Sequence, residues 1–125
     1  MIVLDTSLLV DAFTADQRAA PDVRRAIENG QRLVFPALVL YEWLRGPRIA
    51  PEIALQEQMF PAELALPFQP EDAALSARLY RSVRRARGRE IDLAIAACAI
   101  NRNALLWSSN RADFSDIPGL TLYLP

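Results

Sequence analysis

The chain of 125 residues contains no histidine and no lysine, so all fourteen of its basic residues are arginine. The absence of histidine excludes Ser-His and Cys-His nucleophilic catalysis, and it also excludes metal sites built from imidazole. The absence of lysine excludes a Walker-type phosphate loop and any mechanism through a lysine Schiff base. Catalysis by this chain must therefore rest on carboxylates, hydroxyls, amides, arginine or a bound ion.

Cysteine and long apolar runs are also scarce. Cys98 is the only cysteine, so no intramolecular disulfide can form, which suits the reducing cytoplasm where we expect the protein to act. Cys98 lies in the apolar string Ile95–Ile100, which predicts a buried small side chain and not a nucleophile. No apolar run reaches the roughly 20 residues that span a bilayer. The opening residues Met1–Leu4 lack the basic region and cleavage site of a signal peptide.

The composition is that of a folded protein. Hydrophobic residues make up 52% of the chain, enough for a full core, and the length fits a single domain over residues 1–125. The net charge of −1 does not indicate a nucleic-acid binder, although it averages over acidic and basic patches.

Short apolar stretches alternate with helical ones along the chain. We expect strands at residues 2–4, 33–35, 64–66, 105–107 and 120–123. We expect helices at residues 8–13, from 16 or 21 to 29, and at 36–45, 51–59, 70–87 and 90–102, with Thr6 or Ser7 as the first N-cap. This alternation predicts an α/β fold of three layers, α/β/α, with a mostly parallel central sheet. Active sites of such sheets lie at the carboxyl ends of the strands.

Two polar groups follow strands of the predicted sheet. Asp5 directly follows the strand at 2–4, and the group Ser108–Asn110 follows the strand at 105–107, with Asp113 three residues beyond it. Because the carboxyl ends of parallel strands meet at one edge of a sheet, we expect both groups to open on that edge.

Two further acidic residues lie inside apolar helices. Glu42 is surrounded by apolar residues in the helix 36–45, and Asp92 lies at the start of the most apolar helix, 90–102. Burying an unpaired carboxylate costs several kcal/mol. Each residue therefore needs an arginine partner, a proton or a shared cation.

Each acidic residue taken alone also fits a simpler role. Asp5 could be a turn or capping residue, Glu42 could pair with a nearby arginine, Asp92 could complement a helix dipole, and Asp113 could be an ordinary loop residue. The four together are more informative, because all of them have a route to one edge of the sheet. A carboxylate cluster in a chain without histidine favours hard, oxygen-seeking ions, Mg²⁺ or Mn²⁺.

Four short motifs contain these acidic residues. They are Ile2–Ser7, Leu40–Gly46, Asp92–Ala97 and Ser108–Phe114. In this order, and over nearly the whole chain, they resemble the PIN-domain family, specifically the VapC-type toxins of bacterial toxin–antitoxin pairs. Ser108 stands where the family usually has threonine, which keeps the hydroxyl group.

The resemblance implies a Mg²⁺-dependent endoribonuclease, with Mn²⁺ as the alternative ion. It implies four catalytic carboxylates: Asp5, Glu42, Asp92 and Asp113. We expect Asp5 and Asp92 to be the principal metal ligands, and the other two to bind a second ion or to act through water. Supporting hydrogen bonds are expected from three residues: Thr6, Ser108 and Asn110.

An acidic pocket repels phosphate unless nearby cations guide the RNA backbone. Arg78, Arg81 and Arg85 are spaced to share one face of the expected helix 70–87, and Arg87 lies close by. We expect Arg85 and Arg87 to guide RNA, with a solvated helix face as the alternative.

The resemblance also implies two partners. One is a cognate VapB-like antitoxin whose C-terminal segment would cover the acidic groove, and the other is a second copy of the chain in a homodimer. Candidate apolar contacts, which fit the core equally well, are Leu8, Leu9, Phe13, Trp43 and the region of Tyr41.

Three other functions remain open from the sequence. The first is a PIN-fold protein that binds RNA or a partner without cleaving. The second is a Mg²⁺ phosphatase with Asp5 as covalent nucleophile, but Ser7 stands where such enzymes carry a second aspartate, and the chain has no lysine. The third is a purely structural interaction domain, which gives no reason for the acidic residues inside the Glu42 and Asp92 helices.

Overall fold

The computed structural model describes residues 1–125 and has a parallel three-stranded sheet at its centre. The strands are β1 (Ile2–Leu4), β2 (Leu33–Val34) and β3 (Leu105–Trp107), in the spatial order β2-β1-β3. All three residues of β1 are buried, as expected of a central parallel strand with both faces covered. The predicted α/β fold with a parallel sheet is confirmed.

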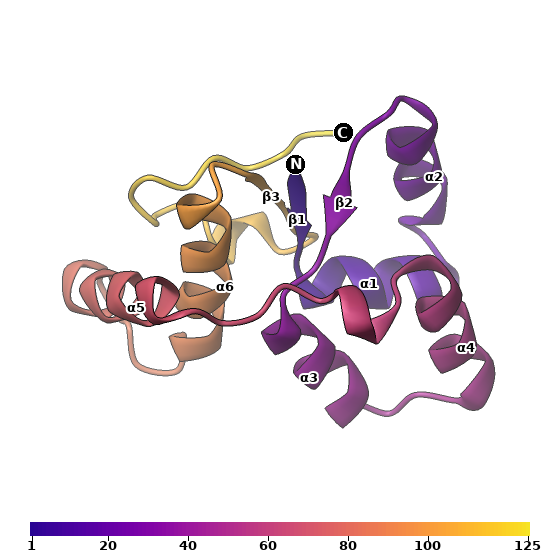
Figure 1. Cartoon of the computed structure of the whole chain (residues 1–125), viewed down its shortest axis with the longest axis horizontal. Helices are drawn as coiled ribbons and strands as arrows, with labels where there is room; N and C mark the ends of the chain where they lie inside the picture. The colour runs from indigo at the N-terminus through magenta and orange to yellow at the C-terminus, as the bar shows by residue number, and fades with distance from the viewer.

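Six α-helices and two short 3₁₀ helices surround the strands. They are α1 (Thr6–Phe13), α2 (Ala20–Glu28), α3 (Ala37–Arg45), α4 (Ala50–Met59), η1 (Ala62–Leu64), α5 (Pro70–Ser82), α6 (Glu90–Asn101) and η2 (Arg111–Asp113). In Figure 1, α5 and α6 lie on one side of the strands, and α2 and α4 lie on the other. Helix α6 buries seven consecutive residues, Leu93–Ala99, whose mostly small side chains let it pass through the core.

None of these helices has the length and apolar character needed to cross a membrane.

A single cluster of 25 buried apolar residues forms the core. The ring of Phe13 packs 6.1 Å from that of Trp43 and 5.9 Å from that of Phe60. Leu8, Leu9, Phe13 and Trp43 are at most 5% exposed, so the sequence-based suggestion that they contact a partner is wrong, and the core interpretation holds. Tyr41 is 53% exposed on α3.

The predicted helix 70–87 is too long at its C-terminal end. Helix α5 ends at Ser82, because Val83 adopts an extended conformation and Arg85 has a left-handed φ of 55°. Leaving the helix at this point lets Ala86 pack into the core. Arg78, Arg81 and Arg85 therefore do not share a helical face.

Two predicted strands and one predicted cap are also wrong. Residues 62–64 form η1, and only Leu66 makes a bridge, to Pro36, since the neighbouring prolines 61 and 67 have no N–H for a ladder. In 120–123 only Leu122 makes a bridge, to Leu106. Asp5, and neither Thr6 nor Ser7, occupies the N-cap position of α1.

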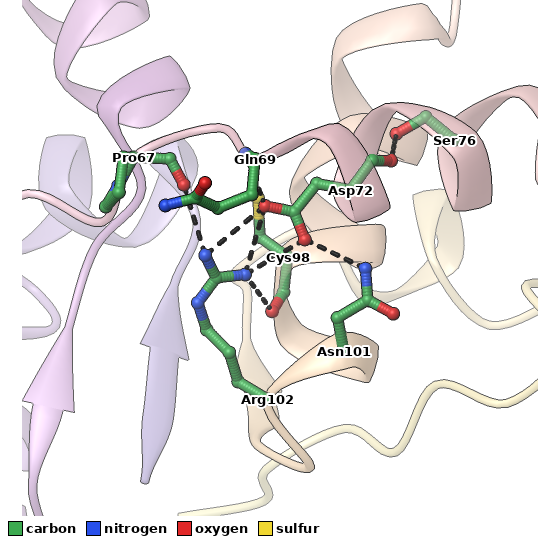
Figure 2. A network of polar contacts seen from close by, with 7 residues as sticks. All are labelled: Pro67, Gln69, Asp72, Ser76, Cys98, Asn101 and Arg102. Atoms are coloured by element: carbon green, nitrogen blue, oxygen red, sulfur yellow. Dashed lines mark hydrogen bonds and ion pairs between the residues drawn. The ribbon is translucent and has the colours of Figure 1, made fainter.

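A buried acidic residue joins α5 to α6 (Figure 2). Asp72, in the first turn of α5, is fully buried. Arg102, just beyond α6, donates from Nη1 to Oδ1 at 3.1 Å and from Nη2 to Oδ2 at 3.2 Å. Asn101 Nδ2 donates to Oδ1, and the N–H of Gln69 donates to Oδ2, both at 2.9 Å. Every acceptor oxygen of this carboxylate is thereby satisfied.

Arg102 also donates to two carbonyl oxygens, those of Cys98 at 2.9 Å and Pro67 at 3.1 Å. Burial alone would raise the pKa of Asp72, but the hydrogen bonds from Arg102 and Asn101 hold that pKa below its usual range. Burial raises the pKa of the neighbouring Cys98 thiol to about 12, so the predicted buried, unreactive cysteine is confirmed. This network ties the two helices together far from the sheet edge that holds the predicted site.

Candidate active site

An open pocket of about 600 Å³ lies at the carboxyl ends of β1 and β3. All four predicted carboxylates line it: Asp5, Glu42, Asp92 and Asp113. They come from four elements, since Asp5 follows β1, Glu42 lies on α3, Asp92 on α6 and Asp113 on η2. The pocket has only two hydrophobic residues in its lining, so it is a polar site open to water.

Asp5 is held in one orientation by two hydroxyl groups. Its residue is only 4% exposed, and its side chain makes no capping hydrogen bond to α1. Instead Ser7 Oγ and Ser108 Oγ both donate to Oδ2 at 2.7 Å. No group of the protein donates to Oδ1. Asp5 thus occupies the N-cap position of α1 without capping the helix through its side chain, and one of its oxygens is free to face a ligand.

The two serines are themselves linked to the loop after β3. Their hydroxyl oxygens lie 3.2 Å apart. Ser7 Oγ accepts a hydrogen bond from the N–H of Ser109 at 3.1 Å, and Ser108 Oγ accepts one from the N–H of Asn110 at 2.9 Å. Ser108 thus contacts Asp5 as expected, while Asn110 contributes its backbone N–H to this network and is among the residues that line the pocket. Ser7 was not among the predicted site residues, although its place two residues after Asp5 was the available signal.

Glu42 has one partner from the site and one from its own helix. Thr6 Oγ1 donates to Oε1 at 2.6 Å, which agrees with the supporting role expected of Thr6. Arg45 Nη2 lies 3.4 Å from Oε2, and its side chain is 54% exposed. An exposed pair at this separation is weak, so the arginine partner foreseen for Glu42 is present but leaves most of the carboxylate's charge available to the pocket.

Asp92 lies in the first turn of α6, and its carboxyl group has the most strongly shifted pKa of the site. Burial, followed by the charges of Asp5, Glu42 and Asp113, raises the pKa of Asp92 to about 6, against an opposing effect of Arg89. Like charges at close quarters disfavour ionisation of one another. The raised pKa of Asp92 thus reflects burial first, and then the negative charges of the three other carboxylates of the pocket.

Arg89, at the N-cap of α6, fixes the loop that carries Asp113. Its guanidinium binds both oxygens of Asp116, at 2.9 and 2.6 Å, and donates to the carbonyl of Asp113 at 2.9 Å. It also donates to the carbonyl of Arg84 at 3.2 Å. The hydrogen bond and charge of Asp116 raise the pKa of Arg89, and those of Arg89 lower the pKa of Asp116. No local pattern indicates this role of Arg89, because Arg89 and Asp116 are 27 residues apart in the chain.

Arginine side chains flank the acidic pocket. Arg18 lines it and pairs with Asp11 of α1 at 3.2 Å, a fifth pocket carboxylate that sequence reasoning missed. A neighbouring hollow of about 500 Å³ contains Asp113 in its lining together with Arg84, Arg85 and Arg89. Arg85 thus lies beside the site, whereas Arg87 lines neither cavity.

The oxygen donors of the pocket fit Mg²⁺ or Mn²⁺ bound through one or two carboxylates. No three carboxylates of the chain come together closely enough to surround one ion. Mg²⁺, however, keeps several waters and binds proteins through one or two carboxylates plus substrate phosphate. Asp5 keeps its Oδ1 free of protein donors, and Asp92 lines the same pocket, so these two carboxylates are available to such an ion.

The sequence profile of the PIN domain matches residues 2–120. The chain belongs to the PIN-domain family. This PIN domain is 33% identical to Ribonuclease VapC19 of Mycobacterium tuberculosis over 122 residues, which cover 96% of this chain and 97% of the relative. The family assignment made from the four motifs is confirmed.

Solved structures share the fold of this PIN domain. A DNA-bound VapBC from Salmonella typhimurium has a TM-score of 0.80 at 20% identity, covering 98% of this chain and 96% of that one. VapBC-5 of Mycobacterium tuberculosis, a member of the VapBC family of toxin–antitoxin systems, has a TM-score of 0.62 at 27% identity, covering 95% and 91%.

Proposed function

We propose that this PIN domain is a metal-dependent endoribonuclease that hydrolyses RNA phosphodiester bonds as the toxin of a toxin–antitoxin pair. The observation that supports this most is the meeting of four carboxylates from four separate elements in one polar pocket. The likeness to Ribonuclease VapC19 over nearly the full length of both chains supplies the substrate class and the reaction.

In the proposed mechanism Asp5 and Asp92 would hold Mg²⁺ or Mn²⁺, and Glu42 and Asp113 would bind a second ion or act through water. When bound, the ion would lower the pKa of a water molecule and offset charge on the phosphate oxygens. Ser7 and Ser108 keep the free oxygen of Asp5 turned to the pocket, and Thr6 holds Glu42. Because the chain has no histidine, a carboxylate is the side chain able to accept a proton near neutral pH.

The purified protein is expected to cleave RNA when Mg²⁺ is present and to stop when EDTA removes the ion. Gel analysis of a mixed RNA substrate, with Mg²⁺ added back after EDTA, measures both effects. A protein that binds RNA with no cleavage at any Mg²⁺ or Mn²⁺ concentration would instead be the inactive PIN-fold binder. Cleavage that persists in EDTA would contradict the role of the metal.

Binding of the ion is expected to weaken as the pH falls below about 6. A carboxylate must lose its proton to bind a cation, and the pKa of Asp92 is raised from 3.8 to about 6. Affinity for Mg²⁺ should then fall about tenfold for each pH unit below that value, since one proton competes with the ion. Calorimetric titration of the wild-type protein across the range from about pH 5 to about pH 7 measures this, and an affinity that stays constant over that range would contradict it.

The raised pKa of Asp92 has the opposite effect on folding: in the metal-free protein, this group stabilises the folded state more at low pH than at neutral pH. The folded state holds the Asp92 proton more tightly than the unfolded chain does. The contribution of this group to stability is therefore full below about pH 4 and is lost as the pH rises to about 6. Thermal melting of the metal-free protein across this pH range measures the effect, and Asp92→Asn, which cannot titrate, is its matched control.

We also propose an antitoxin partner and a homodimer, acting in the cytoplasm. The structural relatives include VapBC complexes, and an antitoxin segment carrying an arginine would suit the net acidic pocket. For the homodimer, α3 offers an exposed apolar surface at Tyr41 and Leu44, which are 53% and 50% exposed.

A further inference from the structure

The hollow beside the acidic pocket has a different charge from the pocket itself. It measures about 500 Å³ and shares Asp113 with the pocket, so the two cavities are adjoining. Its other charged lining residues are Arg84, Arg85, Arg89 and Asp116. A chain that passes over Asp113 as it leaves the carboxylates therefore enters a region rich in guanidinium groups.

Two of these guanidinium groups are free to bind an anion. Arg89 is engaged by both oxygens of Asp116, so this pair adds no net charge. Arg84 and Arg85 have exposed side chains and form no ion pair. The hollow also contains the carboxylate of Asp113, and two free arginines against one carboxylate leave it with a net positive charge.

The backbone that carries these two arginines is held in place. Arg89 donates to the carbonyl of Arg84 and, with the same side chain, to the carbonyl of Asp113. It therefore connects the two walls of the hollow to each other. Arg85 has a φ of 55°, an uncommon conformation for a residue with a side chain, which the surrounding structure must enforce.

A second cavity beside the acidic pocket does not have the same balance of charge. It shares Asp11, Arg18 and Ser109 with the pocket and also contains Asp22 and Arg111. Its two arginines are matched by two aspartates, so it has no excess of cationic side chains. The two cavities that adjoin the pocket thus differ in their charged linings, and only the hollow of Arg84 and Arg85 has an excess of positive charge.

We propose that the hollow of Arg84 and Arg85 binds the backbone phosphates of single-stranded RNA on one side of the linkage that lies in the acidic pocket. This inference rests on the proposed function. No aromatic side chain lines the hollow, so it offers no stacking surface and makes contacts to phosphate. It therefore fixes the register of the RNA in the site without selecting its bases.

The test compares two double variants that each remove two unpaired, positively charged side chains. One is Arg84→Gln/Arg85→Gln. The control is Arg24→Gln/Arg32→Gln. These two arginines form no ion pair, and the cavities that they line share no residue with the acidic pocket. Both are made in an Asp5→Asn background, so that RNA is bound without being cut, and thermal melting checks that each remains folded.

Binding of dye-labelled uridine and adenosine oligonucleotides is then measured by fluorescence anisotropy at increasing KCl concentrations. Each contact to single-stranded nucleic acid contributes about 0.7 to the slope of log K against log salt concentration. The Arg84/Arg85 variant is expected to lower that slope by about 1.4 with both oligonucleotides, and the control is expected to keep the parent slope. An unchanged slope, an equal change in the control, or no RNA binding by the parent would each overturn the proposal.

A second measurement addresses the one-sided character of the contact. The proteins compared here retain Asp5. Neutral methylphosphonate linkages are placed before the mapped cleavage site in one RNA and after it in another, and each cleavage rate is compared with that of unmodified RNA. The Arg84/Arg85 variant is expected to lose its sensitivity to neutral linkages on one side and to keep it on the other; loss on both sides or on neither would overturn the inference. Absence of cleavage by the wild-type protein would reject the proposed function instead, and the anisotropy slopes would still report on the hollow.

Discussion

Replacing Asp5 with asparagine is expected to reduce RNA cleavage to the level seen in EDTA while leaving the protein folded. The asparagine oxygen can accept the hydrogen bonds that Ser7 and Ser108 now donate to Oδ2. The amide nitrogen then replaces Oδ1 and presents a donor to the pocket, where the proposed ion requires an oxygen ligand. Cleavage rates at saturating Mg²⁺ and a thermal melt of the same preparation give the two readouts.

Two variants calibrate this result. Ser108→Ala removes a hydroxyl that orients Asp5, and losing such an outer partner costs about 10–100-fold in metal affinity or activity. Asp16→Asn changes an exposed carboxylate outside the pocket and is expected to cleave normally. An Asp5→Asn protein that loses no more activity than Ser108→Ala would show that Asp5 is not a principal ligand.

Removing Arg102 is expected to destabilise the protein by about 3–5 kcal/mol, because it leaves the buried carboxylate of Asp72 without its cation. Arg102→Ala would also free the carbonyls of Pro67 and Cys98, which now accept hydrogen bonds from the guanidinium. Urea unfolding followed by circular dichroism measures the loss. Since the pKa of Asp72 is held low in the folded protein, the contribution of the pair is present above the ordinary aspartate pKa and is lost as the pH falls below it.

The exposed pair of Arg25 and Asp22 provides the matched control. Its nitrogen–oxygen distance is 2.8 Å, but the arginine side chain is 65% exposed, so Arg25→Ala should cost less than about 1 kcal/mol. The double variant Asp72→Ala/Arg102→Ala should be less destabilised than the sum of its two single variants, because neither buried charge is left alone. A loss in Arg102→Ala as small as that in Arg25→Ala would contradict this account of the network.

The sequence was informative where a local pattern and the global fold agree. An apolar triplet followed by a polar residue predicted β1 and placed Asp5 at its end. The carboxylate in an apolar helix singled out Asp92, whose raised pKa reflects burial among other acids. These features depend on residues close in sequence. Four of the five acidic residues of the pocket could therefore be predicted before any distance was known, Asp113 chiefly through the family resemblance.

The features that the sequence did not predict depend on distant residues or on short elements. The four-residue spacing of Leu75, Leu79 and Val83 fits a longer helix, but tertiary packing of Ala86 ends α5 at Ser82. Arg89 lies in an arginine-rich segment, residues 84–89, and only the fold brings Asp116 to it. Residues 64–66 and 120–123 have the apolar character of strands, yet each pairs at a single position.

The contact between Ser108 and Asp5 has a consequence for the order of events during synthesis. The two residues are separated by 103 positions in the chain, and β1 likewise finds its partner β3 only near the end of the sequence. The ribosome releases the chain from its N-terminus onward, so a nascent polypeptide carries Asp5 long before the hydroxyl that orients it exists. The arrangement that holds Asp5 in the pocket therefore cannot form on the ribosome before Ser108 has been synthesised.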